Sequence, residues 1–221
     1  DIQLLHQMKE QNTLTTQIEP HDCIAELSHS IIRINNILID MNRDIWMYIS
    51  NDLFKLKVIK GEVGSSTMPH KVNPIDFENS EGNLELSNAL FTFFGDKLSK
   101  SRLQRDLSDS TVLRNIGVPF GHSYLAIQSL IKGFSKLEVN KEQSLKELNN
   151  NWQILGEAIQ TVMKLEGYDD AYEIIKDLTR GELLTENSYK SLINSLDISI
   201  KSKSKLLKLT PAKYIGLSKS I

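Results

Sequence analysis

The feature that most constrains the fold is a long run of apolar residues with helical spacing. From Ile24 to Tyr48, apolar side chains recur every three or four positions, which places them on one face of an α-helix of about seven turns. A second apolar set, offset by one position, makes this face wider than one neighbouring helix could cover. The pattern therefore predicts a long helix inside a helix bundle, with Asp22 as its N-cap and its end near Asn51.

The rest of the chain also follows helical periodicity, and strand signals are confined to residues 55–59. Helices are predicted over 76–98 and 110–137, and the Gly-Val-Pro-Phe-Gly stretch at 117–121 is expected to bend the second of these without ending it. Shorter helices are predicted over 141–165, 169–178 and 186–196, followed by a basic tail that ends near Tyr214.

These helices fall into two groups of different length, which predicts an all-α protein with two domains. Residues 1–138 hold the long helices and are expected to form a bundle, and residues 139–221 are expected to form a small helical domain. An apolar face that is too wide for partners within one chain is usually covered by other subunits. We therefore expect the protein to oligomerise.

Charge and cysteine content disfavour several classes of function. Among 221 residues, 26 basic and 28 acidic side chains leave a net charge of -2, so nothing attracts nucleic acid or anionic lipid over a long range. The lysines of the tail 201–213 alternate with serine and leucine, which indicates a solvated helix face. No apolar run approaches the roughly 18 residues of a membrane-spanning helix, and no signal peptide is recognisable. Cys23 is the only cysteine, so we expect no internal disulfide, no cysteine zinc site and a cytoplasmic setting.

The helical period is lost between Asp52 and Asn73, where glycine, serine and proline crowd the sequence. The segment carries two adjacent serines, Ser65 and Ser66, a few residues before Lys71. From chemistry alone, two interpretations stay open. The segment is either a flexible surface loop, or a loop in which Lys71 and Asn73 hold a substrate anion while a serine transfers a proton.

The amino-acid sequence of this loop resembles a known signature. Residues 61–79 read GEVGSSTMPHKVNPIDFEN, and GSSTMPHKVNPIDFE matches the GSSxMPxKxNxxxxE pattern of the fumarase/aspartase superfamily. Members of this superfamily resemble one another in forming homotetramers around a long-helix bundle, with active sites shared between subunits. They release fumarate from a succinyl-bearing substrate by removing a proton β to the leaving group. The resemblance implies the same fold, assembly and type of reaction for this chain.

Two further stretches resemble the adenylosuccinate lyase family within that superfamily. They are TTQIEPHD at 15–22 and SRLQRDLSDSTVLRN at 101–115, and TPAKYIG at 210–216 extends the likeness over nearly the whole chain. The likeness covers only about the second half of the enzyme, so residues 1–138 would form the C-terminal part of its central bundle. It implies cleavage of adenylosuccinate to AMP and fumarate, and of succinylaminoimidazole carboxamide ribotide to the carboxamide ribotide and fumarate. These are steps of purine biosynthesis that need neither cofactor nor metal.

The resemblance assigns the catalytic roles to the signature loop, residues 61–79. Ser65 resembles the base that takes the succinyl β-proton, and Ser66 stays open as the alternative base. Lys71 would stabilise the serine alkoxide and the aci-carboxylate that forms when the proton leaves. Glu78 resembles the partner that orients an acid histidine. The alternative interpretation of Glu78 is a first-turn carboxylate that the helix dipole favours.

The resemblance also implies a nucleotide-binding cluster. Ser110 and Arg114 are expected at the 5′-phosphate with Arg105 nearby, and Ser110 and Arg114 share a helix face because they lie four residues apart. The alternative interpretation is that Arg105 pairs with Asp106, and Arg114 with Asp109, as surface ion pairs. The full substrate-binding set that the resemblance implies is Gln17, Ser66, Lys71, Val72, Asn73, Asn79, Arg105, Ser110, Thr111 and Arg114.

The histidines leave the general acid unassigned. In the superfamily, a histidine protonates the departing nitrogen, and the matching position lies upstream of the first residue of this chain. His70 lies in the loop where the signature is loose, and the other four histidines are interpreted as packing or surface residues. For His21, which follows the Gln17 motif, a place near the ligand stays open as the alternative. We therefore expect the isolated chain to be inactive.

Two other functions stay open from the sequence. One is another fumarate-releasing lyase, such as argininosuccinate lyase, whose amino-acid substrate needs no phosphate site. The cluster over residues 105–114 disfavours this. The other is a helical assembly module without catalysis, which the intact set of Ser65, Lys71, Asn73 and Glu78 disfavours. We expect a small-molecule nucleotide substrate, and neither nucleic acid nor a membrane, as the partner.

Overall fold

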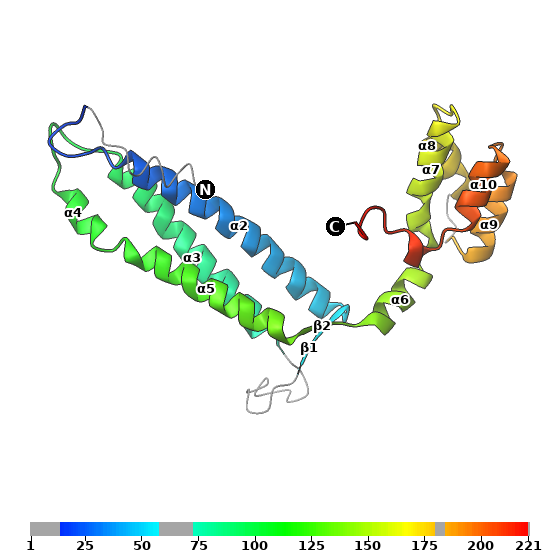
Figure 1. Ribbon diagram of the computed structural model, residues 1–221, viewed down its shortest axis with the longest axis horizontal. Coiled ribbons are helices and arrows are strands. Elements are labelled where there is room, and N and C mark those ends of the chain that lie inside the picture. The colour runs from blue at the N-terminus through cyan, green and yellow to red at the C-terminus, as the bar shows by residue number, and fades with distance from the viewer. Residues whose placement is uncertain (1–13, 58–72, 180–183, 221) are drawn as a thin grey trace. The chain divides into compact units, whose positions relative to one another are not determined.

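The computed structural model describes residues 14–57, 73–179 and 184–220, and most of these residues are helical (Figure 1). The predicted all-α class is confirmed, because the described residues contain only one two-stranded sheet. The chain divides between Val139 and Asn140 into two compact units.

The first unit is a bundle of long helices that run side by side (Figure 1). They are α2 (Asp22–Ser50), α3 (Ile75–Leu98) and α5 (Gly117–Lys136). Apolar side chains form three clusters along the bundle, centred on the buried residues Phe91, Leu84 and Phe77. The predicted helical face of α2 therefore packs mainly against α3, whose own face packs against α5.

The start of α2 differs from the predicted start by one residue. Asp22 is the first helical residue, and His21 is the N-cap with the left-handed backbone angle φ of 56°. The side chain of Glu19 accepts a hydrogen bond from the His21 backbone N–H at 2.7 Å, so the chain turns at His21. Asp22 still acts on the helix, because a carboxylate in the first turn interacts favourably with the helix dipole.

The bent helix predicted over 110–137 is in fact two helices. Helix α4 (Ser108–Leu113) ends before α5 begins at Gly117. Pro119 is the third residue of α5, where the backbone needs no N–H because the first turn of a helix has no carbonyl partner for it. The glycine and proline stretch therefore begins a helix rather than bending one.

A short antiparallel sheet closes one end of the bundle. Strand β1 (Phe54–Leu56) pairs with β2 (Leu137–Val139), with Phe54 opposite Val139. β1 falls at the predicted strand signal, whereas β2 follows directly from α5 and carries no alternation that predicted it.

One buried lysine contacts the chain on both sides of residues 58–72. The carbonyl of Lys136 accepts a hydrogen bond from the Lys57 N–H at 2.9 Å, and its ammonium donates to the Asp76 carboxylate at 2.6 Å. The side chain of Lys136 is 4% exposed and that of Asp76 is 12% exposed. A second lysine, Lys132, approaches the same carboxylate at 3.4 Å but is half exposed. Lys136 therefore ties the end of β1 to the start of α3.

We expect Lys136→Met to lower the free energy of unfolding of the bundle by about 3–5 kcal/mol, because it leaves a buried carboxylate without its main partner. The matched control, Lys132→Met, removes an exposed cation from the same carboxylate and should cost less than about 1 kcal/mol. Urea unfolding followed by Trp46 fluorescence in a Trp152→Phe background reports on the bundle alone. Equal losses of unfolding free energy in the two variants would contradict the interpretation that Lys136 is the main partner of Asp76.

A buried polar network joins the three long helices at their middle. The Asn35 amide of α2 donates to Ser87 of α3 at 3.3 Å and to Ser123 of α5 at 3.1 Å. Ser87 in turn donates to the Pro119 carbonyl at 2.9 Å. Buried polar groups need such partners, so only one axial alignment of the helices satisfies this network.

The second unit is a set of short helices around one apolar core. In chain order they are α6 (Lys141–Asn149), η1 (Trp152–Leu155), α7 (Gly156–Leu165), α8 (Ala171–Thr179), α9 (Glu186–Ser195), α10 (Ile200–Leu207) and η2 (Pro211–Lys213). The helix predicted over 141–165 is interrupted at residues 150–151 and continues as η1 and α7. Tyr189 lies at the centre of the core and donates to the Leu206 carbonyl at 2.9 Å, and burial raises the pKa of this phenol to about 12.

Candidate active site at two ends of the bundle

The predicted site residues that the structure describes lie in two groups, one at each end of α3. The first group, which we call the loop end, is the chain from Asn73 to Asn79, where the signature loop enters α3. The predicted residues Ser65, Ser66, Lys71 and Val72 fall outside the described residues. Asn73 is partly exposed beside Pro74, the N-cap of α3.

Glu78 lies in the first turn of α3 and is exposed. Its carboxylate accepts a hydrogen bond from the indole N–H of Trp46, on α2, at 2.9 Å. No histidine among the described residues contacts this carboxylate. Its position satisfies the helix-dipole interpretation, and its exposure leaves one carboxylate oxygen accessible to a group from outside this chain.

Asn79 belongs to a small array that sequence reasoning missed. The Asn83 amide donates to the Asn79 carbonyl at 2.9 Å and to its side-chain oxygen at 3.2 Å. The side-chain oxygen of Asn83 lies 2.8 Å from Nδ1 of His122, on α5. His122 was expected to be a packing or surface residue. The i, i+4 spacing of the two asparagines was the only sequence signal, and nothing in the sequence pointed to His122.

The second group, which we call the α4 end, joins two segments that are far apart in sequence. The Gln17 segment, residues 14–20, lies against the chain that follows α3, where the Gln17 N–H donates to the Gln104 carbonyl at 3.3 Å. A cavity of about 200 Å³ lies between the two segments, and residues of both line it, including His21, Lys100 and Asp109. The structure therefore brings Gln17 close to the stretch that carries Arg105.

Helix α4 presents the remaining predicted residues. Ser110 is the third residue of α4 rather than its first, and its hydroxyl donates to the Leu107 carbonyl at 3.0 Å. Thr111 is exposed, and its carbonyl accepts from the Asn115 amide at 3.2 Å. Arg114 follows at the C-cap, four positions after Ser110, so the two can share a helix face.

The surface ion pairs that were the alternative interpretation do not form. Asp106 pairs with Arg102 at 3.0 Å, and Asp109 faces His21 at 3.5 Å. Within the part of the chain that the structure describes, the side chains of Arg105 and Arg114 make no hydrogen bond or ion pair. Both residues are exposed at one end of the bundle, and no described side chain occupies their guanidinium groups.

Local hydrogen bonds stabilise the charge on Asp106. Its carboxylate accepts the Ser108 backbone N–H at 2.9 Å and the Arg102 guanidinium at 3.0 Å. These contacts, the Ser108 N–H first, hold the pKa of Asp106 well below its usual range. The carboxylate is thus engaged with its own loop and does not neutralise Arg105.

The two groups cannot meet within one subunit. Helix α3 separates them, and at about 1.5 Å per residue the distance from Asn79 to Leu98 is about 30 Å. Figure 1 shows α4 and the start of α2 at one end of the bundle and the β1–β2 sheet at the other. On one protomer, Glu78 and Asn79 therefore lie far from Ser110 and Arg114 of the predicted phosphate site.

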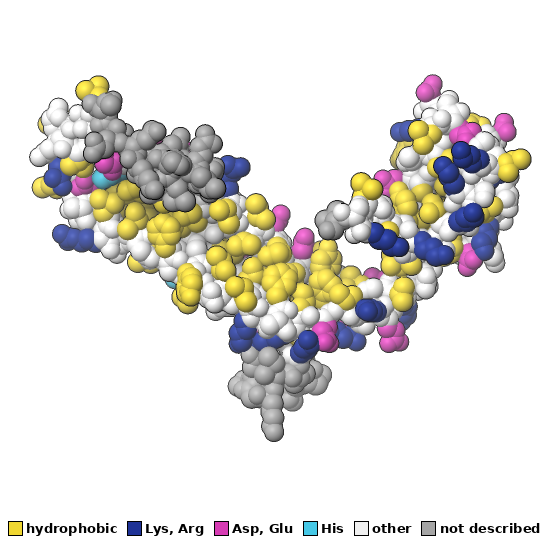
Figure 2. Space-filling view, viewed as in Figure 1, with side chains coloured by type: hydrophobic (Ala, Val, Ile, Leu, Met, Phe, Trp, Pro, Cys, Tyr) yellow, Lys and Arg dark blue, Asp and Glu magenta, His cyan; other side chains and the backbone are white. Residues whose placement is uncertain are grey.

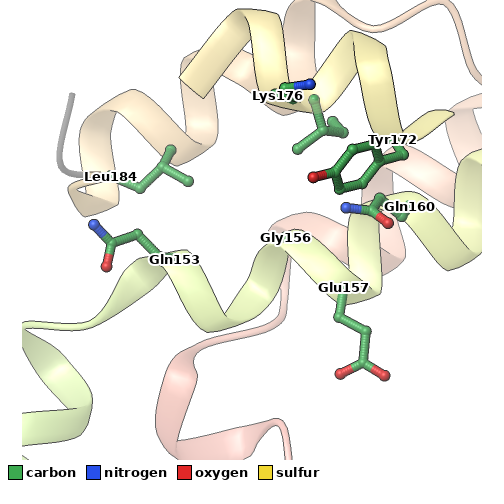
Figure 3. Close-up of a pocket in the computed structure, with 8 residues that line it drawn as sticks. Gln153, Gly156, Glu157, Gln160, Tyr172, Lys176 and Leu184 are labelled. Carbon is green, nitrogen blue, oxygen red and sulfur yellow. The ribbon is translucent and has the colours of Figure 1, made fainter. Parts of the chain in front are cut away.

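A further cavity, of about 350 Å³, lies in the second unit between α7 and α8 (Figure 3). It contains none of the predicted site residues. Figure 3 shows Glu157 pointing away from the space between Gln153, Gln160, Tyr172 and Leu184. Lys176 instead pairs with Glu173 at 3.2 Å and lies over the Tyr172 ring. The lining has no converging set of catalytic groups.

Two features of other protein classes are absent from the described residues. In residues 14–57, 73–179 and 184–220, no three His, Cys, Asp or Glu side chains are grouped to hold a metal ion. Among the same residues, no helix has the length and apolar content to cross a membrane.

Comparison with known families shows which family the chain belongs to. The family model for the adenylosuccinate lyase C-terminal region matches residues 101–215, which is more than half of the chain and includes the whole Arg105 to Arg114 cluster. The chain belongs to the adenylosuccinate lyase C-terminal family. A second model, described as lyase, matches residues 1–86 and thus the segment that holds the signature loop.

Several curated proteins named adenylosuccinate lyase are similar to this family member. The protein of Legionella pneumophila strain Corby is 58% identical over 94% of this chain, and that of Escherichia coli K12 is 56% identical over 93%. The protein of Dictyostelium discoideum is 51% identical over 98%. The matched region is 45–47% of each relative, so the chain spans about half the length of the curated relatives it matches.

Solved structures show the same fold at low identity. Class II fumarase from Schistosoma mansoni covers 88% of this chain with a TM-score of 0.64 and 20% identity. The 3-carboxy-cis,cis-muconate lactonizing enzyme from Pseudomonas putida covers 90% with a TM-score of 0.66 and 20% identity. The adenylosuccinate lyase C-terminal family thus shares its helical bundle with enzymes of other names.

Proposed function

We propose that this chain is the C-terminal half of a cytoplasmic adenylosuccinate lyase. The enzyme would eliminate fumarate from adenylosuccinate to give AMP, and from succinylaminoimidazole carboxamide ribotide in the same biosynthesis of purines. The observation that carries the proposal is the α4 end, where Arg105 and Arg114 are exposed without ion-pair partners among the described residues. A substrate with a phosphate needs such cations, and a substrate without one does not.

In the proposed nucleotide site, Ser110, Thr111 and Arg114 bind the 5′-phosphate. The Arg114 guanidinium supplies charge-assisted hydrogen bonds, and the hydroxyls donate further ones, that of Ser110 in place of its contact to the Leu107 carbonyl. Arg105 contacts the nucleotide from the loop before α4. Gln17 hydrogen-bonds the succinyl or base portion, and its segment is already held against this loop by the contact to Gln104.

In the proposed catalytic site, Ser65 removes the succinyl β-proton and Ser66 binds substrate beside it. Lys71, Val72 and Asn73 bind a succinyl carboxylate, and the charge of Lys71 stabilises the aci-carboxylate intermediate as it forms. Asn79 contacts the substrate from the first turns of α3. No cofactor or metal takes part in this elimination.

Glu78 completes the proposed site by orienting a histidine that another part of the protein supplies. Its exposed carboxylate, anchored by the Trp46 indole N–H, can accept a hydrogen bond from an imidazole. That histidine would protonate the departing nitrogen of the substrate.

We propose that the active enzyme is a homotetramer with shared active sites. The separation of about 30 Å between the loop end and the α4 end supports this, because separate subunits must then bring the two groups together. Large apolar side chains also remain exposed along the bundle, as Figure 2 shows on one face. They include Ile37, Phe93, Tyr124, Leu125 and Ile131, and such surfaces mark subunit contacts.

The test uses a fused enzyme, in which this chain follows the part of the Escherichia coli relative that precedes its matched segment. The fused enzyme should cleave adenylosuccinate, followed by the change in ultraviolet absorbance of the purine, and should leave argininosuccinate intact. Cleavage of argininosuccinate alone would favour the rival lyase. A folded tetramer without activity on either compound would favour an assembly module.

A separate variant of the fused enzyme tests whether Arg114 binds the phosphate. Arg114→Ala in the fused enzyme should weaken AMP binding by about 1.5–3 kcal/mol, because a charge-assisted hydrogen bond is lost, and should leave inhibition by fumarate unchanged. Arg33→Ala, at an exposed arginine of α2, is the control. Unchanged AMP affinity in calorimetry would show that Arg114 is not at the phosphate.

A further inference from the structure

His21 is a buried histidine that the proposed reaction does not use. Its side chain is 11% exposed, although it stands at the start of a helix at one end of the bundle. Its backbone is in the left-handed region, with φ of 56° and ψ of 21°. Left-handed residues other than glycine are uncommon and tend to mark functional sites, where the surrounding contacts hold them.

The two ring nitrogens of His21 face two carboxylates from different parts of the chain. Nδ1 contacts Glu19, which also accepts the His21 backbone N–H. Nε2 makes no hydrogen bond to any described residue, but it lies 3.5 Å from Asp109, whose side chain is also 11% exposed. Ionised carboxylates only accept hydrogen bonds, so of these three side chains it is the ring that can connect the other two.

Each carboxylate belongs to one half of the proposed nucleotide site. Glu19 is two residues after Gln17, in the segment that contacts Gln104. Asp109 is the second residue of α4, the helix that carries Ser110 and has Arg114 as its C-cap. Its other carboxylate oxygen accepts the Ser110 backbone N–H at 2.6 Å. The line from Glu19 through His21 to Asp109 therefore joins the Gln17 segment to α4.

We propose that His21 is a positioning residue that sets the distance between the Gln17 segment and α4, and thereby the affinity for the nucleotide. This assignment rests on the proposed function. His21 would act through its two carboxylate neighbours and would touch neither the substrate nor the reacting atoms. The 200 Å³ cavity beside it, between the same two segments, leaves room for the segments to shift when the connection is broken.

Two substitutions separate this role from a purely local one. The amide nitrogen of asparagine can take the place of Nδ1, so His21→Asn keeps the contact to Glu19 and also tolerates the left-handed backbone. It is too short to reach Asp109. The amide nitrogen of glutamine can take the place of Nε2, so His21→Gln retains the side that faces Asp109. A residue needed only to begin α2 would be replaced well by asparagine.

The experiment measures the KM for adenylosuccinate, kcat and the AMP dissociation constant in the fused enzyme. His21→Asn should raise KM and the AMP dissociation constant about tenfold, because it leaves the Asp109 carboxylate without the imidazole that faces it, with kcat within about threefold of the unmodified enzyme. The inhibition constant of fumarate should not change. His21→Gln should restore both nucleotide constants to within about threefold. His29→Asn, at an exposed histidine of the same helix, should have no effect.

A double variant tests the connection itself. Asp109→Ala alone should raise the two nucleotide constants as His21→Asn does, and combining the substitutions should add no more than about twofold, because both remove one interaction. Additive effects would show that His21 and Asp109 act separately and would overturn the assignment.

Two other results would overturn the proposal for His21. If His21→Asn leaves the nucleotide constants unchanged, or lowers kcat and the melting temperature at constant KM, then His21 only stabilises the start of α2 and the proposal is wrong. If the unmodified fused enzyme neither cleaves adenylosuccinate nor binds AMP, the proposed function fails and this assignment fails with it. The first result leaves the proposed function standing, so the two failures are distinguishable.

Discussion

Ser65→Ala in the fused enzyme is expected to remove turnover while leaving adenylosuccinate binding within about tenfold of the unmodified enzyme. The serine acts on the β-proton in the transition state, and removing a positioned base costs about 10²–10⁴-fold in rate. Its contribution to holding the ground state is small. The measurement is kcat from the absorbance assay, together with substrate affinity from calorimetry on the inactive variant.

Ser66→Ala is the matched control for this prediction, because it removes the same hydroxyl one residue away. We expect it to weaken substrate binding while turnover at saturating substrate persists. If Ser65→Ala is active and Ser66→Ala is not, the base is Ser66. Parallel losses of rate and affinity in Ser65→Ala would instead indicate that Ser65 binds substrate.

The second large effect concerns the 221-residue chain by itself. We expect it to have no measurable lyase activity, even when it is folded and associated. Elimination needs the departing nitrogen to be protonated, a contribution of roughly 10²–10⁴-fold, and no histidine of this chain matches the position of the acid in the signature. Adding the upstream half, covalently or by mixing, should restore activity.

The structure supports this expectation for His21, one of the two histidines that could replace the missing acid. Both of its ring nitrogens face carboxylates of its own chain, and it lies at the α4 end, about 30 Å from Glu78. The other, His70, lies outside the described residues. Full activity of the isolated chain would show that one of them is the acid, and that the assignment from the signature is mistaken.

Complementation between subunits tests the shared active site in the same system. A fused enzyme with Ser65→Ala and a fused enzyme without the acid histidine should each be inactive. Mixed tetramers should recover part of the activity, because some sites receive both groups from different subunits. No recovery after mixing and refolding would mean that one subunit supplies both groups.

Much of the fold follows from sequence because periodicity is a local property. The apolar spacing in α2 and α3 defines helices whatever surrounds them, so these helices were predicted to within a residue or two. The break between α4 and α5 was missed. Gly117 and Pro119 are compatible both with a bend and with a helix start, and only packing against α3 selects one of them.

The candidate site was predictable only as a set of residue types in a signature. The loop wording and the cluster over 105–114 pointed to the residues, because their chemistry and order along the chain can be read directly. The sequence could not show whether Arg105 and Arg114 form ion pairs with neighbouring acids. The neighbouring acids Asp106 and Asp109 are engaged by Arg102 and His21, and one of these comes from a distant segment.

The sequence by itself determined the helical class, the family and the residues that carry the proposed chemistry. Only the tertiary structure decided which of these residues lie together. It placed Glu78 and Asn79 at one end of α3 and Arg114 at the other, and it placed Gln17 against Gln104 and His21 opposite Asp109 of α4. The physical reason is that helical spacing and motif chemistry act over a few residues, whereas the length of α3 and the contacts between distant segments set distances in space.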